Sequence, residues 1–308
     1  MINISFTSIA VVLSLLCATS CNKHAIDDET RFEEEMTGTE VSFLPKGIMN
    51  EDDIDTKTSV VTSLDASGFY ASAVKGSPGS DIQAWSNVSF TKVGDDFKGG
   101  KYWPINNPSY RFYAANVPLT YSSGGATVSA ENSIDVVCAY KASPTYGARN
   151  TLNFEHIYAR IGTVNVTATA PYSISNVTIW IVNPKTGGTY NLYTGAGATD
   201  ATGWSSLTPS SAYNSQIFSR SPAISSGSSA GVANDFYVVP GTYQLKATWT
   251  AGVGDYSQTY TTKTSTTNVT IQRGKVNTIN CSLSGDASSI TVSVSLMAWQ
   301  SENIIASF

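Results

Sequence analysis

Charged residues are scarce in this sequence: they make up 13% of its 308 residues, and no cluster of lysine and arginine occurs anywhere. With a net charge of -5 at pH 7, the chain offers no basic stripe to a nucleic acid or to an anionic membrane. We therefore expect no nucleic-acid partner. Serine, threonine, asparagine and glycine must fill much of the surface instead, as suits an exported protein.

Helical patterns are missing as well. From Glu40 onward, no stretch sustains the spacing of three and four residues that puts apolar side chains on one face of a long helix. Apolar and polar residues instead alternate in short runs that end at glycine, proline or other turn residues. This alternation predicts an all-β fold, and 308 residues with 41% hydrophobic content suffice for the cores of two domains.

The alternating runs are clearest after residue 150. The side chains that share a face within each run are Val164, Val166, Ala168; Val177, Ile179, Ile181; Phe236, Val238; Tyr243, Leu245, Ala247, Trp249; Val269, Ile271; Ile279, Cys281, Leu283; and Ile290, Val292, Val294, Leu296. Before residue 150, the aromatic run from Tyr110 to Ala115 predicts a strand with a large apolar surface. Strands at this spacing indicate β-sandwiches, and we place an N-terminal domain at 39–150 and a C-terminal domain at 151–308.

Glycine-rich segments predict the connections. Gly, Ser and Thr dominate 194–211 and 219–231, which we expect to form long surface loops. Gly195, Gly197 and Gly203 superficially resemble a nucleotide-binding loop, but they lack the strand-to-helix context that would direct amides at a phosphate. They are therefore interpreted as part of a flexible loop.

The first twenty residues contain no charged side chain, and their short apolar stretch 9–18 leads through small residues to Cys21. Such a stretch is too short to span a bilayer as a mature helix, and small residues before a cysteine are what a lipoprotein signal peptidase requires. We expect 1–20 to be a lipoprotein signal peptide, Cys21 to carry the lipid, and 21–38 to be an acidic tether. Lysine and arginine are absent from 1–8, so an ordinary secretory signal or an uncleaved anchor is the alternative.

Cysteine is scarce, with four in the sequence. Cys17 lies in the expected signal peptide and Cys21 at its end, which leaves Cys138 and Cys281 for the folded part. These two could form one disulfide in an oxidising compartment. Two separate buried thiols are favoured, because the residues lie far apart in the sequence and in different predicted domains.

Histidine is scarcer still, and this limits the catalytic chemistry. His24 falls in the tether, so a catalytic triad would need His156, and nothing in the sequence places a nucleophile or a carboxylate beside it. We expect His156 to be a packed structural residue. The acidic residues at 27–35 and 51–55 lack the spacing of calcium ligands and are expected to be solvated. The sequence therefore predicts no catalytic, cofactor or metal site.

Seven local patterns follow one another along nearly all of the mature chain. They are the lipid-bearing Cys21; a Thr56-Lys57 step; Tyr102-Trp103-Pro104 before the aromatic strand; Leu152, Phe154, His156 and Arg160; a Val-Val-Pro-Gly hairpin at Val238 to Gly241; an Arg-Gly-Lys turn at Arg273 to Lys275; and a Val-x-Val strand before Trp299. None is diagnostic alone. Together, in this order, they resemble the fimbrillin-like family of Bacteroidales surface proteins, which includes the FimA-like and Mfa-like type V pilins.

The resemblance implies two transthyretin-like Greek-key β-sandwich domains and a particular route of assembly. In this family the precursor is exported as an outer-membrane lipoprotein, and a trypsin-like protease cuts after a basic residue. The N-terminal strand is then lost, and the C-terminal strand of another subunit fills the opened groove by donor-strand exchange. The chain would thus be a fimbrial subunit, in the stalk or in an accessory or tip position, that supports adhesion at the cell surface and has other fimbrial subunits as partners.

The family pattern carries over to individual residues. Val41 and Phe43 would be the core side chains of the displaced N-terminal strand, and cleavage would follow Lys57, with Lys46 and Arg31 as rival sites. The donor strand would lie within the last nineteen residues, where three apolar side chains alternate after Trp299: Ile304, Ala306 and Phe308.

The aromatic content allows a second function. A surface lipoprotein that never polymerises could stack exposed Trp and Tyr rings on glycans, although most of the 6 Trp and 16 Tyr fall in strand patterns that favour core packing. A third function, that of a β-sandwich hydrolase, would require a carboxylate pair or a site built on His156. We expect that the protein is not an enzyme.

Overall fold

Strands form both ends of the molecule and its middle. The computed structural model describes residues 38–47, 64, 66–76, 82–104, 109–122, 125–131, 134–253, 256–285 and 290–298, with the backbone alone for 256–267 and 298. Within these ranges lie twenty strands and no helix, which confirms the all-β prediction. The same ranges contain no apolar helix of membrane-spanning length.

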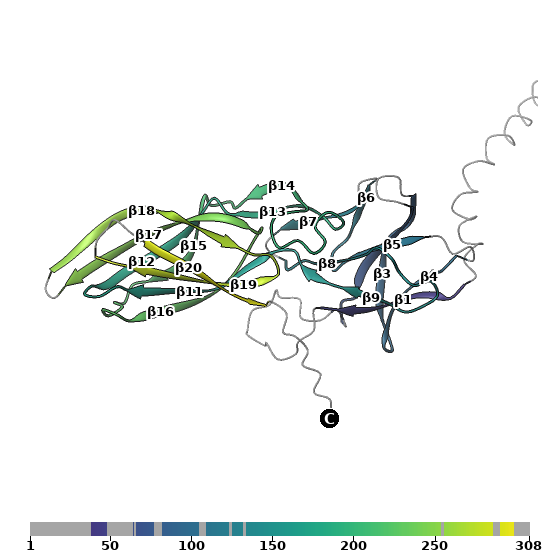
Figure 1. Cartoon of the computed structure of the whole chain (residues 1–308), viewed down its shortest axis with the longest axis horizontal. Helices are drawn as coiled ribbons and strands as arrows, with labels where there is room; N and C mark the ends of the chain where they lie inside the picture. Colours follow the sequence, from purple (N-terminus) through teal and green to yellow (C-terminus); the bar gives the residue numbers. More distant parts are fainter. Residues whose placement is uncertain are drawn as a thin grey trace, which may run out of the picture.

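An eight-stranded sheet forms one end of the elongated molecule (Figure 1). Its strands are β1 (Glu40–Lys46), β2 (Phe69–Lys75), β3 (Ile82–Val93), β4 (Asp96–Tyr102), β5 (Tyr110–Ala115), β8 (Val137–Lys141), β9 (Asn150–Asn153) and β10 (Glu155–His156). Their spatial order is β10-β8-β5-β2-β3-β4-β1-β9. The two outermost strands, β9 and β10, are consecutive in the chain with only Phe154 between them, so the sheet curls around until its ends meet.

The curled sheet encloses an aromatic core. Its buried rings belong to Phe43, Phe69, Trp85, Phe90, Phe97, Trp103, Tyr110, Phe112 and Phe154. Aromatic side chains bury a large area each, so a few of them fill the space between the strands. The predicted aromatic strand Tyr110–Ala115 is β5, and it is buried on both faces: Phe112 faces this core, whereas Tyr113 faces a second one.

Two four-stranded sheets pack face to face at the other end. One holds β11 (Ala159–Ala168), β16 (Ser229–Val238), β19 (Lys275–Leu283) and β20 (Ile290–Ala298), and the other holds β12 (Ser173–Val182), β15 (Asn214–Arg220), β17 (Gly241–Val253) and β18 (Tyr256–Ile271). Their spatial orders are β16-β11-β19-β20 and β15-β12-β17-β18.

The side chains predicted to share the strand faces of this half form its core. Val164, Ile179 and Leu245 are among those buried between the two sheets. The exception is Leu296, which is 44% exposed near the end of β20. The reason is that β20 is an edge strand, paired only with β19 among the described strands.

The short connections in this half cross between the sheets. The segment Val238 to Gly241 leads from β16 to β17, and the turn at Arg273 leads from β18 to β19. Each pair of strands belongs to different sheets. The predicted hairpin at Val238 to Gly241 is therefore wrong, because a tight turn can also carry the chain over the core to the facing sheet.

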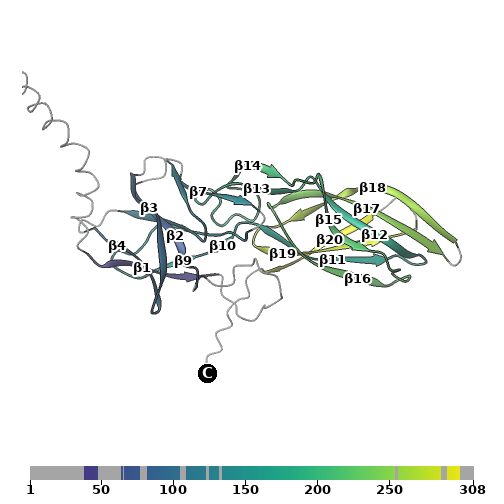
Figure 2. The ribbon, with the colours of Figure 1, turned by 180° about the vertical axis from the view of Figure 1, so that it is seen from behind.

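A third sheet joins the two ends (Figure 2). Its strands are β6 (Thr120–Ser122), β7 (Gly125–Glu131), β13 (Lys185–Asn191) and β14 (Trp204–Pro209), in the order β14-β13-β7-β6. The core beneath it draws on both sides of residue 150, with Val128, Tyr158, Tyr190 and Tyr237 among its members. The prediction of a surface loop over 194–211 is wrong in part, since β14 lies within it. Pairing also crosses residue 150 at β1–β9 and β8–β10, so the domain boundary stays a prediction.

Candidate functional site

β1 lies inside the eight-stranded sheet and not at its edge. It runs antiparallel to β4, with Ser42 opposite Lys98, and parallel to β9, with Phe43 beside Asn150. Figures 1 and 2 show β1 and β9 next to each other. Because β1 has a neighbour on each side, its removal would leave two open strand edges facing one slot.

Two side chains of β1 reach the centre of the aromatic core. Val41 and Phe43 are both 0% exposed. The ring centroid of Phe43 lies 4.9 Å from that of Phe90 and 5.0 Å from that of Phe112, both in edge-on geometry, and 6.0 Å from that of Phe69. Edge-on ring pairs attract one another beyond the gain from buried area. The slot that β1 occupies is therefore lined largely by aromatic rings.

Backbone hydrogen bonds hold both ends of β1. The N–H of Trp103 donates to the carbonyl of Thr39 at 3.0 Å, and the N–H of Phe154 donates to the carbonyl of Lys46 at 2.8 Å. Lys46, one of the candidate cleavage residues, is the exposed last residue of the strand. The other processing, lipid and donor candidates lie outside the described residues: Cys21, Arg31, Lys57, Ile304, Ala306 and Phe308.

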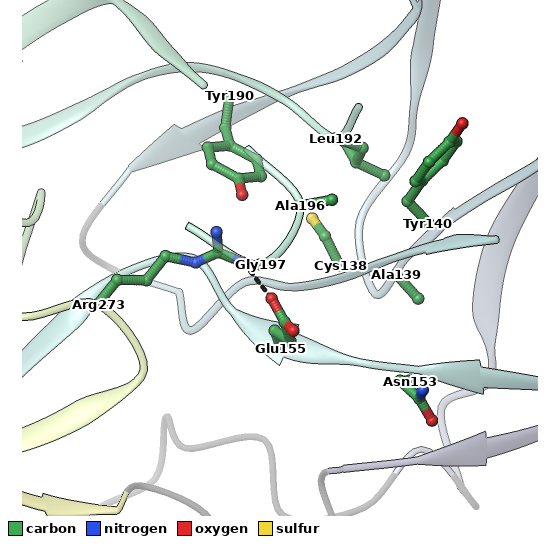
Figure 3. Close-up of a pocket in the computed structure, with 10 residues that line it drawn as sticks. All are labelled: Cys138, Ala139, Tyr140, Asn153, Glu155, Tyr190, Leu192, Ala196, Gly197 and Arg273. Carbon is green, nitrogen blue, oxygen red and sulfur yellow. Dashed lines mark hydrogen bonds and ion pairs between the residues drawn. The ribbon is translucent and has the colours of Figure 1, made fainter. Parts of the chain in front are cut away.

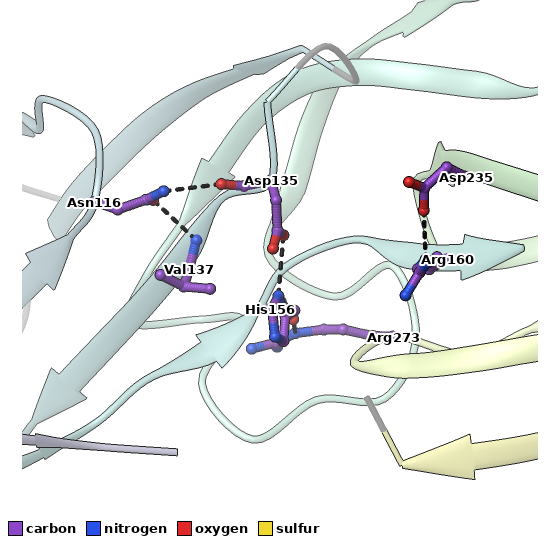
Figure 4. Close-up of polar contacts among 7 residues, drawn as sticks. All are labelled: Asn116, Asp135, Val137, His156, Arg160, Asp235 and Arg273. Atoms are coloured by element: carbon purple, nitrogen blue, oxygen red, sulfur yellow. Dashed lines mark hydrogen bonds and ion pairs between the residues drawn. The ribbon is translucent and has the colours of Figure 1, made fainter. Parts of the chain in front are cut away.

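A carboxylate lies beside His156, contrary to the prediction. His156 is buried, and its Nδ1 is 3.0 Å from Oδ1 of Asp135, which is buried as well. The two residues meet because β8 and β10 pair antiparallel with Val137 opposite His156, and Asp135 lies two residues before Val137. Figure 4 shows the contact, together with Asn116, whose amide nitrogen donates to the backbone carbonyl of Asp135 at 2.8 Å.

Arg273 forms a second buried polar cluster beside the first. Its guanidinium, almost fully buried, donates from Nη2 to the Glu155 carboxylate at 2.7 Å and from Nε to the carbonyl of His156 at 3.1 Å. Nη1 donates to the carbonyls of Ala198, at 3.1 Å, and Gly195. Hydrogen bonds of this kind, in which the donor is charged, are about twice as strong as neutral ones.

The loop that receives Arg273 is anchored, although its glycines predicted a flexible segment. Gly195 is buried, and its carbonyl also accepts a hydrogen bond from the hydroxyl of Tyr190 at 2.7 Å. A Cβ at position 195 would collide with the Tyr190 ring, so glycine is needed there for close approach. Burial raises the pKa of Tyr190, and the Arg273 cation opposes this shift only in part.

A pocket of about 140 Å³ opens next to the Arg273–Glu155 pair. Figure 3 shows the guanidinium and the carboxylate facing each other at one side of it, with Tyr140 and Asn153 at the other. The Glu155 side chain is 46% exposed and that of Arg273 only 3%, so the carboxylate is the part of the pair that solvent reaches. Each charge is neutralised by the other, which leaves the pocket without a strong net field.

The described residues contain no group of three or more His, Cys, Asp or Glu side chains that could hold a metal ion. Sequence reasoning did not find the Asp135–His156 and Arg273–Glu155 pairs. The sequence did contain a signal for the Arg273–Glu155 pair. Arg273 lies in a tight turn of a chain with few charged residues, and an arginine in such a place indicates a structural ion pair.

Cys138 and Cys281 are free buried thiols in separate cores, as predicted. Burial raises the pKa of Cys281 to about 12 and also raises that of Cys138 far above its usual value. The reactive species is the thiolate, which is nearly absent at neutral pH when the pKa is this high.

We expect both thiols to be inert in the folded protein. A chain that begins at residue 22, and so lacks Cys17 and Cys21, should not react with Ellman's reagent at pH 8 until guanidinium unfolds it. Titration of free thiols before and after unfolding measures this. Rapid reaction of either cysteine in the folded protein would contradict the burial described above.

The sequence matches the model of one protein family, described as fimbrillin-like, over residues 55–299. No curated protein matches it. Among solved structures, it is similar to a fimbrial protein from Bacteroides vulgatus, with 15% identity over 84% of this chain and 99% of that one and a TM-score of 0.49. It is also similar to a candidate cell adhesion protein from Parabacteroides distasonis, with 13% identity over 85% and 97% and a TM-score of 0.50. At such identities, structural likeness speaks for the fold alone.

Proposed function

The chain belongs to the fimbrillin-like family, and on this basis we propose that it is a fimbrial subunit, in the stalk or in an accessory or tip position, that polymerises by strand exchange and supports adhesion. The observation that carries the proposal is the place of β1. A strand near the start of the chain fills the core with Val41 and Phe43 and lies between two other strands. Another strand with the same alternation can take its position.

The proposed route begins with export as a lipoprotein through Cys21, which anchors the precursor in the outer membrane. A trypsin-like protease then cuts after Lys57, with Lys46 and Arg31 as the rival sites. A cut at Lys57 falls beyond β1 in the sequence, so the hydrogen bonds of β1 stay intact until the strand leaves. A cut at Lys46 would have to open the hydrogen bond between the Lys46 carbonyl and Phe154.

The donor is proposed to come from the tail that carries Ile304, Ala306 and Phe308. Residues Ile290–Ala298 are already paired with β19 along their length, so we propose that the donor is drawn from the residues that follow them. Burial of two apolar side chains in the positions of Val41 and Phe43 contributes about 3 to 6 kcal/mol before ordering costs. The two recovered strand ladders add to this.

The proposal includes a finer description of the fold. Each half would be a transthyretin-like Greek-key sandwich, divided near residue 150, and the mature subunit would reside in the fimbrium at the cell surface. Its role would be structural and adhesive and not enzymatic, with no cofactor. Its partners would be other fimbrial subunits.

Limited trypsin digestion tests the proposal. The digested precursor is expected to give a ladder of oligomers on a gel run without boiling, because an inserted strand is released only when the core opens. A Lys57→Gln variant serves as the control and should remain monomeric, whereas Lys46→Gln and Arg31→Gln should still form the ladder. A trimmed monomer alone, from the unaltered chain, would count against polymerisation.

A glycan-binding lipoprotein is the second candidate, and one observation favours it. Tyr140 lines the pocket, and the centroid of its ring lies 5.4 Å from that of Tyr193, in edge-to-face geometry. Tyr193 is 38% exposed. Exposed tyrosine rings can stack on sugars. Glycan-array binding that is lost in a Tyr193→Ala variant, from a protein that forms no oligomers after trypsin, would support this function over the first.

A further inference from the structure

One wall of the slot, β9, loses its strand ladder once β1 has gone, and only the packing of Leu152 and the hydrogen bonds of Asn150 then hold it directly among the contacts described. β9 pairs with β1 and with no other described strand, and the adjoining Phe154 also bonds to Lys46 of β1. We propose that Arg273 is the positioning residue that keeps this wall in place while the slot is empty. The inference rests on the proposed strand exchange and adds the element that keeps the slot ready for a donor.

The contacts of Arg273 converge on the segment that follows β9. Its guanidinium binds β10 through the carboxylate of Glu155 at 2.7 Å and through the backbone carbonyl of His156 at 3.1 Å. Asn153 ends β9, and only Phe154 separates it from Glu155. The contacts of Arg273 with β10 therefore begin two residues along the chain from the end of β9, and they restrain its position.

The backbone of Arg273 is anchored outside the eight-stranded sheet. It lies in the turn between β18 and β19, its backbone N–H donates to the carbonyl of Thr199 at 3.0 Å, and the N–H of Gly274 donates to that of Tyr158 at 2.9 Å. None of these groups belongs to β1 or to the strands beside it. The departure of β1 would thus leave the anchor unchanged.

A second contact holds β10 from the other side. His156 faces Asp135, whose backbone carbonyl accepts from Asn116, and the side-chain oxygen of Asn116 accepts from the N–H of Val137 at 3.0 Å. Figure 4 shows these residues and Arg273 around His156. Breaking buried polar contacts leaves groups without partners, which is costly, so the segment is held in one position.

This arrangement predicts a difference between two states of the protein. In the precursor, β9 is held by the β1 ladder and by Arg273 together, and loss of one leaves the other. After β1 leaves, Arg273, the short β8–β10 pairing and the His156–Asp135 contact still hold β10, and Leu152 and Phe154 still pack in the core. Lysine at position 273 keeps the charge but cannot reproduce the fork of donors, so it should weaken strand uptake far more than it weakens the precursor.

The test uses the full chain, cut with trypsin, and a fluorescent peptide of residues 38–47 that exchanges with the resident strand. Arg273→Lys should lower peptide affinity about tenfold or more, as expected for lost hydrogen bonds to a charged group. The uncut Arg273→Lys variant should melt a few degrees lower than the unaltered chain, because a buried donor is lost, and peptide affinity is therefore compared at a temperature at which both cut proteins stay folded. Arg160 is a matched control, because its guanidinium pairs with Asp235 at 2.6 Å, and among the described residues its side chain forms no hydrogen bond or ion pair with β9 or β10.

Equal peptide affinity in the Arg273→Lys protein and the unaltered chain would overturn the inference, as would an equal loss in Arg160→Lys. If Arg273→Lys fails to fold, Glu155→Gln decides, since that side chain is 46% exposed and its change spares the core. It should lower affinity severalfold, and unchanged affinity would overturn the inference. Failure of the unaltered protein to take up any peptide would instead refute strand exchange itself, and the role of Arg273 with it.

Discussion

Replacing both Ser42 and Lys98 with cysteine is expected to abolish polymerisation under oxidising conditions and to restore it on reduction. The two residues lie directly opposite each other on the antiparallel strands β1 and β4. Cβ atoms of such pairs are about 4.5 to 5.5 Å apart, close to the separation that a disulfide requires. The protease could still cut the chain, but the bonded strand could not leave, and no donor could enter.

Gels of trypsin-treated protein, with and without reductant, measure this effect. The single variants Ser42→Cys and Lys98→Cys are the controls and should polymerise in both conditions. The native Cys138 and Cys281 are buried and should not compete for the new bond. A full ladder from the oxidised double variant would show that β1 need not leave.

Replacing Phe43 with alanine is expected to destabilise the uncut precursor by about 3 to 5 kcal/mol, the usual cost of deleting a buried phenylalanine ring. Three other rings lie within 6.0 Å of it, so the cavity cannot close by movement of one neighbour. Chemical denaturation of the precursor measures the loss. After strand exchange, β1 is no longer part of the subunit, so oligomers made from the variant should be as stable as those of the unaltered chain.

Leu44→Ala is the matched control for this prediction. Leu44 follows Phe43 on the same strand and is only half-buried, with its side chain on the other face. Leu44→Ala should therefore lower the free energy of unfolding of the precursor clearly less than Phe43→Ala does. Equal destabilisation by the two substitutions would mean that the aromatic slot does not hold β1.

The C-terminal half was the most predictable part of the fold. Runs such as Val164, Val166 and Ala168 repeat every second residue, and each strand presents one face to one core. The alternation therefore predicts both where a strand lies and which of its faces is buried. The middle sheet gave no such signal: β13 contains Gly187 and Gly188, and its pairing with β7 depends on residues far away in the sequence.

Part of the candidate site could likewise be predicted from the sequence, and part could not. The alternation of Val41 and Phe43 predicts a strand with one apolar face, and the structure buries both side chains. The parallel neighbour β9 could not be read from a local pattern, because pairing between distant strands leaves no periodic trace. The meeting of Asp135 with His156 is likewise set by the register of β8 and β10, which sequence spacing does not reveal.

If the chain is exported as proposed, the parallel pairing of β1 with β9 also sets an order of events in its folding. A chain threaded through a membrane from its amino terminus delivers β1 first, β9 much later and β13 later still. Contacts between such distant segments form slowly, since a long loop must close first. Under the proposed export, Phe43 would emerge before most of the walls of its cavity, and β7 would gain its partner β13 only once Asn191 has been translocated.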